Sequence, residues 1–258
     1  MKKIILTLGV VIAAALYFNG DKEMTADYSS EESSEKTASS ARNESADKST
    51  ANNQNKKIDL NAYETDITMS DAYYANSVYF NNLKYDVAFA DSFRKAQTVF
   101  KDSPNSEDIA LWIALGAVMD SSHEYGELLS YSIGKINENA ARNLSSFETA
   151  SKELAPSDSF IRGQLINLVN QMNITSEDKI RYFGHEISRQ ASLDSDGKLS
   201  EDSLNVTTAL IMLKNNDAKS EDVIEYMRES LRTNQNPIIR QKLMVRFKTY
   251  FPNASINL

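Results

Sequence analysis

The residues that come closest to a metal site form a run of acidic and small side chains, residues 192–203. Asp194, Asp196 and Gly197 occupy the third, fifth and sixth positions of a calcium-binding loop, in which carboxylate oxygens hold the ion and glycine makes the turn. The first and last positions are both serine, where such a loop has an aspartate and a bidentate glutamate. We therefore expect a linker between helices here, and no metal site.

Other residues with catalytic chemistry are few. The two histidines, His123 and His185, are not spaced as zinc ligands, because the residue four positions after each is Glu127 or Arg189. The chain has no cysteine and no Gly-x-Ser-x-Gly turn, which excludes thiol chemistry and the commonest serine-hydrolase motif. We expect no catalytic residue, no cofactor and no metal. The alternative is a helical enzyme of the cell envelope, with an acidic active site that the sequence does not mark.

Aromatic residues are dense in the first part of the globular region. Helical spacing places some of them on two apolar stripes, one with Tyr79 and Leu83 and the next with Phe89, Phe93 and Phe100. Stripes of this kind are typical of a core. Aromatic rings that fall off the stripes supply large contact areas and are favoured anchors at protein interfaces. We therefore expect a partner-binding surface at Tyr73, Tyr74, Phe80 and Tyr85.

The end of the chain is basic, because residues 228–248 contain six basic side chains against the single acid Glu229. Such a surface fits an anionic partner or lipid headgroups. It also fits the solvated back of a last helix whose apolar stripe is Ile239, Leu243 and Phe247. The net charge of −8 argues against nucleic acid as a partner. The basic candidates for partner binding are Arg228, Arg232, Arg240, Lys242, Arg246 and Lys248.

The elements that position these residues are helices, and a repeated segment is their clearest sign. Residues 176–183 and 220–227 both begin Ser-Glu-Asp and carry an isoleucine and a tyrosine at the same positions, 44 residues apart. A serine followed by two acids is typical of a helix start, because the hydroxyl accepts a free backbone N–H and the carboxylates face the positive end of the helix dipole. A period of this size indicates stacked helical hairpins. We expect both segments to be second helices of hairpins.

The first helices of these hairpins also correspond. Arg162 and Arg240 each follow an isoleucine, 78 residues apart, and Pro237 comes three residues before Arg240. The spacing of proline, isoleucine and arginine resembles the first helix of the HEAT family of helical repeats. Asn205 stands in place of the arginine in the middle unit, and the proline has no counterpart in the other two.

The resemblance implies an all-α fold in which antiparallel helical hairpins stack as a short α-solenoid. We expect the HEAT-like repeats over residues 156–258 and an aromatic-rich helical subdomain over residues 58–155. A plain helical bundle, whose helices share Ser-Glu-Asp starts by chance, is the alternative.

The N-terminal part has the pattern of an export signal followed by a tether. Lys2 and Lys3 precede an uncharged run, so we expect residues 1–20 to be a signal anchor or a signal peptide. An uncleaved anchor keeps the N-terminus in the cytoplasm and places the domain on the extracytoplasmic side, which is the periplasm in a Gram-negative bacterium. Cleavage instead gives a secreted or periplasmic protein. Residues 21–57 are polar and without helical or strand periodicity, which predicts a disordered linker.

Together these patterns predict a non-catalytic, exported scaffold or adaptor that binds another protein. The contact with the membrane is expected through residues 1–20 alone, and neither the partner nor the oligomeric state follows from the sequence.

Overall fold

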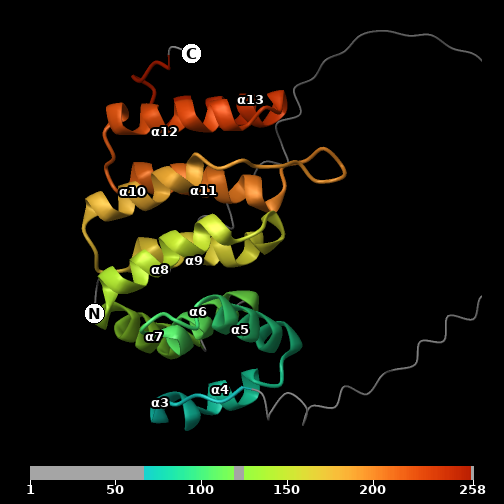
Figure 1. The fold of residues 1–258 in the computed structure, drawn as a ribbon, viewed down its shortest axis with the longest axis vertical. Coiled ribbons are helices and arrows are strands. Elements are labelled where there is room, and N and C mark those ends of the chain that lie inside the picture. The colour runs from blue at the N-terminus through green and yellow to red at the C-terminus, as the bar shows by residue number, and fades with distance from the viewer. Residues whose placement is uncertain (1–66, 119–124, 257–258) are drawn as a thin grey trace, which may run out of the picture. The chain divides into compact units, whose positions relative to one another are not determined.

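The computed structural model describes residues 67–118 and 125–256, which form helices joined by loops (Figure 1). All of them belong to one compact unit, Asp59–Leu258. In these described residues the only extended pairing is an isolated antiparallel bridge between Leu193 and Leu199. The prediction of an all-α fold is therefore confirmed. The expected signal or anchor, residues 1–20, and the expected linker, residues 21–57, lie outside the described residues.

The helices have the following bounds. The first half contains α3 (Ala72–Ala75), α4 (Val78–Leu83), α5 (Val87–Val99), α6 (Ser106–Val118), α7 (Gly126–Glu138) and α8 (Ala140–Glu153). After the short 3₁₀ helix η3 (Pro156–Asp158), the second half contains α9 (Ser159–Gln171), α10 (Ser176–Ile187), α11 (Glu201–Asn215), α12 (Ser220–Thr233) and α13 (Pro237–Tyr250).

The aromatic first stripe does not lie on one helix. Asp71 caps α3 by accepting a hydrogen bond from the Tyr73 N–H, and α3 ends at Ala75. Ser77 then caps α4, and its hydroxyl accepts from the Phe80 N–H. Two caps six residues apart break the expected helix, because each side chain satisfies backbone donors that a continuous helix would pair internally.

The repeated Ser-Glu-Asp segments do begin helices, but their serines are not the caps. In α10 the capping side chain is Thr175, whose hydroxyl accepts from the Asp178 N–H at 3.1 Å. In α12 the residue before the helix is Lys219, which makes no side-chain cap. The two copies thus each begin a helix at their serine, while the first turns of the two helices are held differently.

The core is densest around α5 and α6, which pack along each other. The second stripe is confirmed, since Phe89, Phe93, Ala96 and Phe100 are all buried. Residues 108–115 of α6 are buried on every side of the helix. A helix that is apolar all round belongs in the middle of a helical stack.

The second half continues from this core as a series of packed helices. Figure 1 shows them in rows that follow the chain, from α3 and α4 at one end to α12 and α13 at the other. Helices α9, α11 and α13 pack in chain order, and α10 packs against both α11 and α12. The division into subdomains at residue 155 stays a prediction.

Two glycines let neighbouring helices approach closely. A Cβ at Gly163 of α9 would lie 2.7 Å from Asn205 of α11. A Cβ at Gly184 of α10 would lie 2.3 Å from the ring of Tyr226 on α12. A larger residue at either position would displace the contacting side chain, and the ring of Tyr226 lies directly on the backbone of α10.

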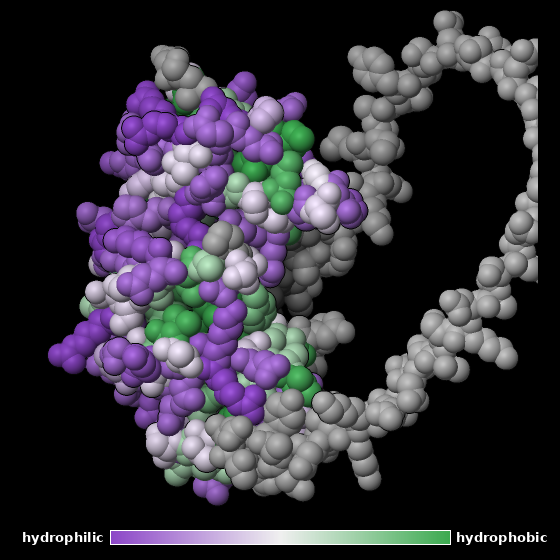
Figure 2. Space-filling model, turned by 45° about the vertical axis from the view of Figure 1, so that its right-hand side comes forward, coloured by the Kyte–Doolittle hydropathy of each residue, from purple (hydrophilic) through white to green (hydrophobic). Residues whose placement is uncertain are grey.

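Polar side chains cover most of the described surface on the face shown in Figure 2. The large apolar side chains that are clearly exposed lie near the two ends of the stack: Tyr73, Val78, Tyr79 and Val87 at one end, Ile238 and Val245 at the other. Among the described helices, none is both long and apolar enough to cross a membrane.

Candidate functional site

Two of the four aromatic candidates are in the core. Tyr74 is 0% exposed and Phe80 is 3% exposed, so the expectation that they lie on a partner-binding surface is wrong. The break between α3 and α4 changes the face of the residues that follow it, and Phe80 packs against Phe89 in the core. The Tyr74 hydroxyl donates to Asp108 Oδ1 at 2.5 Å, which accounts for its polar atom inside the core.

The other two aromatic candidates remain at the surface. Tyr73 is 39% exposed and stacks on Tyr131, with ring centroids 4.0 Å apart. Tyr85 is half-buried, and the ammonium group of Lys84 lies over its ring at 5.3 Å. Their role in partner binding stays a prediction. Tyr79, which the first stripe placed in the core, is 39% exposed and contacts Tyr125 instead.

The basic candidates on α12 are matched by acids one turn earlier. Arg228 forms an ion pair with Glu225 at 3.1 Å, and Arg232 forms one with Glu229. The expected excess of positive charge is therefore partly neutralised along this helix. Such exposed pairs within a helix contribute little to stability.

Of the four basic candidates on α13, two are half-buried and two are exposed. Arg240 is half-buried and donates from Nη1 to the Leu231 carbonyl at 2.5 Å. Arg246 is also half-buried, whereas Lys242 and Lys248 are exposed. Binding of an anionic partner by this end of the domain stays a prediction.

Residues 192–203 form a closed turn in which the carboxylate of Asp194 binds backbone N–H groups. Asp194 Oδ1 accepts from the N–H groups of Asp196 at 3.0 Å and Lys198 at 2.7 Å. Gly197 adopts a positive φ of 74°, and Ser200 caps α11. Across the described residues, no three histidine, cysteine, aspartate or glutamate side chains come together as a metal site. His123 lies outside the described residues.

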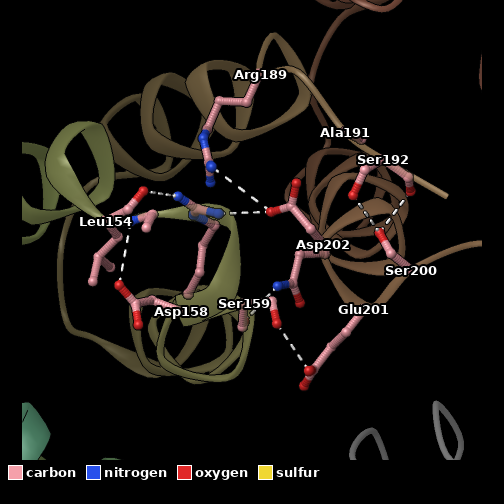
Figure 3. Close-up of polar contacts among 12 residues, drawn as sticks. Leu154, Asp158, Ser159, Arg189, Ala191, Ser192, Ser200, Glu201 and Asp202 are labelled. Carbon is pink, nitrogen blue, oxygen red and sulfur yellow. Dashed lines mark hydrogen bonds and ion pairs between the residues drawn. The ribbon is translucent and has the colours of Figure 1, made fainter. Parts of the chain in front are cut away.

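The structure instead reveals a cluster of buried charged residues between α9, α10 and α11, which the sequence reasoning missed. Arg162 is 0% exposed; its Nη1 lies 2.6 Å from Asp202 Oδ1 and its Nη2 donates to the Leu154 carbonyl at 2.6 Å. In Figure 3, the Asp202 carboxylate points toward the side of the view on which Leu154 lies, and Arg189, which follows the end of α10, points toward it from above. Arg189 Nη2 is 3.7 Å from Asp202 Oδ1.

Glu186 extends the cluster toward the surface. It is 1% exposed, and its Oε2 lies 3.1 Å from Arg189 Nη1. The hydroxyl of Ser151, on α8, donates to its Oε1. Burial raises the pKa of Glu186 to about 7, although Ser151 and the charge of Arg162 favour the ionised form. A glutamate with this pKa exchanges its proton near neutral pH.

Glu186 lies at the floor of a cleft of about 660 Å³ formed by α8, α10 and α12. The Tyr182 ring is beside it, with a side chain that is 1% exposed and a hydroxyl that makes no hydrogen bond of ordinary geometry. Burial and the charge of Glu186 raise the pKa of Tyr182 well above its usual range. The walls include His185 and Tyr226, whose rings are 6.1 Å apart and nearly perpendicular.

A second cleft, of about 540 Å³, lies between residues 98–103 and α8. Its acidic residues, Asp102, Glu153 and Asp158, are exposed or half-buried, and Asp158 pairs with Lys95. This cleft contains no buried ionisable side chain, so its acids keep contact with solvent. The cleft at Glu186 is the better candidate for a binding or reactive site.

A signal for Glu186 and Arg162 was present in the sequence. Glu186 falls between Phe183 and Ile187 on the apolar side of α10, and Arg162 is next to Ile161 on that of α9. Charged residues on an apolar helix face require partners, and only the fold shows which ones they have. Comparisons with protein-family models, with characterised proteins and with solved structures found no significant match.

Proposed function

We propose that this chain is a non-catalytic scaffold that binds a partner protein through a HEAT-like α-solenoid. In this proposal residues 1–20 hold the protein at the membrane, residues 21–57 act as a tether, and the helical domain lies on the extracytoplasmic side. A tethered module meets its partner at raised effective concentration, so surface complementarity is its whole mechanism.

One recurring contact carries the solenoid part of the proposal. The Arg162 guanidinium donates to the Leu154 carbonyl at 2.6 Å, and the Arg240 guanidinium donates to the Leu231 carbonyl at 2.5 Å. Both arginines are in first helices and both hold the end of the preceding helix. A side-chain contact that recurs in addition to the recurring sequence supports a common origin for the two hairpins.

The cleft between α8, α10 and α12 supports binding by the second helices. It brings together side chains from three helices that are separate in the sequence, as the groove of a repeat protein does. Its volume of about 660 Å³ is suited to a few side chains of a partner.

Site-directed photo-crosslinking in the native membrane tests the scaffold. A crosslinking amino acid replaces His185 or Glu225 in the cleft, Tyr73 or Lys242 on the surfaces predicted from the sequence, and exposed Gln241 as a reference. We expect one discrete protein adduct from a cleft position and none from Gln241. Absence of an adduct at every position would contradict the scaffold.

An envelope enzyme is the second candidate, and Glu186 is the observation that favours it. A buried carboxyl with a pKa of about 7, beside a serine hydroxyl, resembles a general acid or base. The test is incubation of the protein with isolated cell-wall material, followed by mass spectrometry of released fragments. Products formed by the natural protein and lost in Glu186→Gln would favour the enzyme over the scaffold.

A further inference from the structure

The floor of the cleft carries three oxygen atoms that converge from two helices. Ser151 of α8 donates its hydroxyl proton to Glu186 of α10, and Tyr182 lies one turn before Glu186. The Tyr182 hydroxyl is buried beside the Ser151 hydroxyl and makes no hydrogen bond of ordinary geometry. A buried hydroxyl left unpaired is costly, and its position in a cleft indicates a group that a ligand completes.

The floor of the cleft offers oxygen acceptors. Four glutamates line the cleft against three basic side chains, and all four are ion-paired, Glu225 and Glu229 with Arg228 and Arg232 outside the lining. Both arginines of the lining are already shared between two carboxylates each. Arg181 pairs with Glu148 and Asp178, and Arg189 pairs with Glu186 and Asp202. A carboxylate ligand would meet no unshared guanidinium at the floor.

The wall of the cleft is aromatic. The Tyr226 ring lies against Gly184, where no side chain keeps it away from α10, and against the imidazole ring of His185. An aromatic wall above a carboxyl group accommodates the methylene stem of a lysine and attracts its ammonium group.

We propose that this cleft binds a lysine side chain of the partner protein, an inference that rests on the scaffold function proposed above. The ammonium group would lie at the floor and donate to the oxygens of Glu186, Ser151 and Tyr182, while its methylene stem would pack along Tyr226. An ammonium has three donors, which matches three converging oxygens better than the planar guanidinium of arginine does.

The pKa of Glu186 is consistent with this assignment. The effect of burial on this pKa is only partly offset by Ser151 and Arg162, so a further positive charge beside the carboxyl would lower its pKa. A bound ammonium would supply that charge and favour the ionised carboxylate.

The test is a titration of the full-length protein in detergent micelles, followed by ¹⁵N NMR at the amides of residues 184–188. The probes are the capped tripeptides Gly-Lys-Gly, Gly-norleucine-Gly and Gly-Glu-Gly, with cadaverine as a free diamine. We expect the lysine peptide to shift these amides saturably, and the norleucine and glutamate peptides to bind at least about tenfold more weakly. Equal binding of lysine and norleucine peptides, or tighter binding of the glutamate peptide, overturns the proposal. Tighter binding of cadaverine than of the lysine peptide overturns the assignment to a partner protein.

Matched variants locate the site. Glu186→Gln keeps the shape of the side chain and is expected to weaken binding of the lysine peptide by about tenfold or more. Tyr182→Phe removes an unpaired hydroxyl, so it is expected to fold normally and to weaken binding as well. Glu177→Gln, exposed in the first turn of the same helix, is the control and should leave binding unchanged. Unchanged affinity in both Glu186→Gln and Tyr182→Phe contradicts the site.

The scaffold and the lysine site fail separately. If the lysine peptide binds at Glu186 but crosslinking gives no protein adduct, the ammonium site is supported and the scaffold function is contradicted. If the crosslinked adduct forms equally well with Glu186→Gln, the scaffold function is supported and the lysine site is contradicted.

Discussion

Arg162 and Asp202 form an ion pair inside the domain, with Nη1 and Oδ1 2.6 Å apart and side chains only 1% and 4% exposed. The pair connects α9 to α11 across 40 positions of the chain. Arg189 and Glu186 extend it toward the cleft. Removing one partner of a buried pair leaves a charge without compensation, which costs far more than the pair itself contributes.

Arg162→Met is therefore expected to lower the free energy of unfolding by about 3–5 kcal/mol, as measured by urea denaturation followed by circular dichroism. Arg228→Met is the matched control, because Arg228 pairs with Glu225 at the surface, and should change it by about 0–1 kcal/mol. The double replacement of Arg162 by Met and Asp202 by Leu should recover much of the loss. Equal effects of the two single replacements would contradict a structural role for the buried pair.

Glu186 is expected to make stability depend on pH. Its pKa in the folded protein is about 7, above its ordinary value of 4.5, so the folded state holds the proton more tightly than the unfolded state. The stabilising contribution is complete below pH 4.5 and is lost as the pH rises through 7. From pH 5 to pH 8, the natural protein should lose on the order of 2–3 kcal/mol relative to Glu186→Gln. Asp202, whose pKa burial also raises, acts in the same direction in both proteins. Parallel stability curves for the two would contradict the raised pKa.

The helical core was predictable because it depends on local periodicity. Phe89, Phe93 and Phe100 repeat at helical intervals, and all three are buried. Phe80 was misplaced because Ser77 begins a new helix after Ala75, and such a break changes the face on which every following residue lies. Tyr74 precedes the break and is buried where its hydroxyl reaches Asp108.

The buried charges depend on contacts that no local pattern records. Arg162, Glu186 and Asp202 come from three helices, and each is tolerated inside only because the others are there. The cleft likewise requires α8, α10 and α12 to lie together. Sequence periodicity indicates that a charged residue is on an apolar helix face. Tertiary packing determines whether that residue forms a structural ion pair or lines a binding site.

Gly184→Ala is expected to displace the Tyr226 ring, since the new Cβ would lie 2.3 Å from it. The ring is partly exposed and able to move, so the free energy of unfolding should fall by about 1 kcal/mol, at the low end for overpacking. In a Tyr226→Ala background the same change should instead stabilise by about 0.5–1 kcal/mol, because the clash is gone and alanine favours the helix. Gly134→Ala on α7, where no atom lies within 4 Å, should stabilise by about 0.5–1 kcal/mol. Urea unfolding of the natural protein, Gly184→Ala, Tyr226→Ala and the double variant gives the coupling energy between positions 184 and 226. A coupling energy near zero would show that these two residues do not touch.

Tyr74→Phe tests the placement of this residue in the core. The change removes the hydrogen bond to Asp108 Oδ1 and leaves Asn105 as the remaining side-chain donor to that buried carboxyl. Burial already raises the pKa of Asp108, so its charge is poorly solvated. We expect a loss of about 1–3 kcal/mol in the free energy of unfolding. Tyr73→Phe, on the neighbouring exposed ring, should change stability by less than about 0.5 kcal/mol. If Tyr74→Phe were as mild as Tyr73→Phe, the hydrogen bond between α3 and α6 would not stabilise the domain.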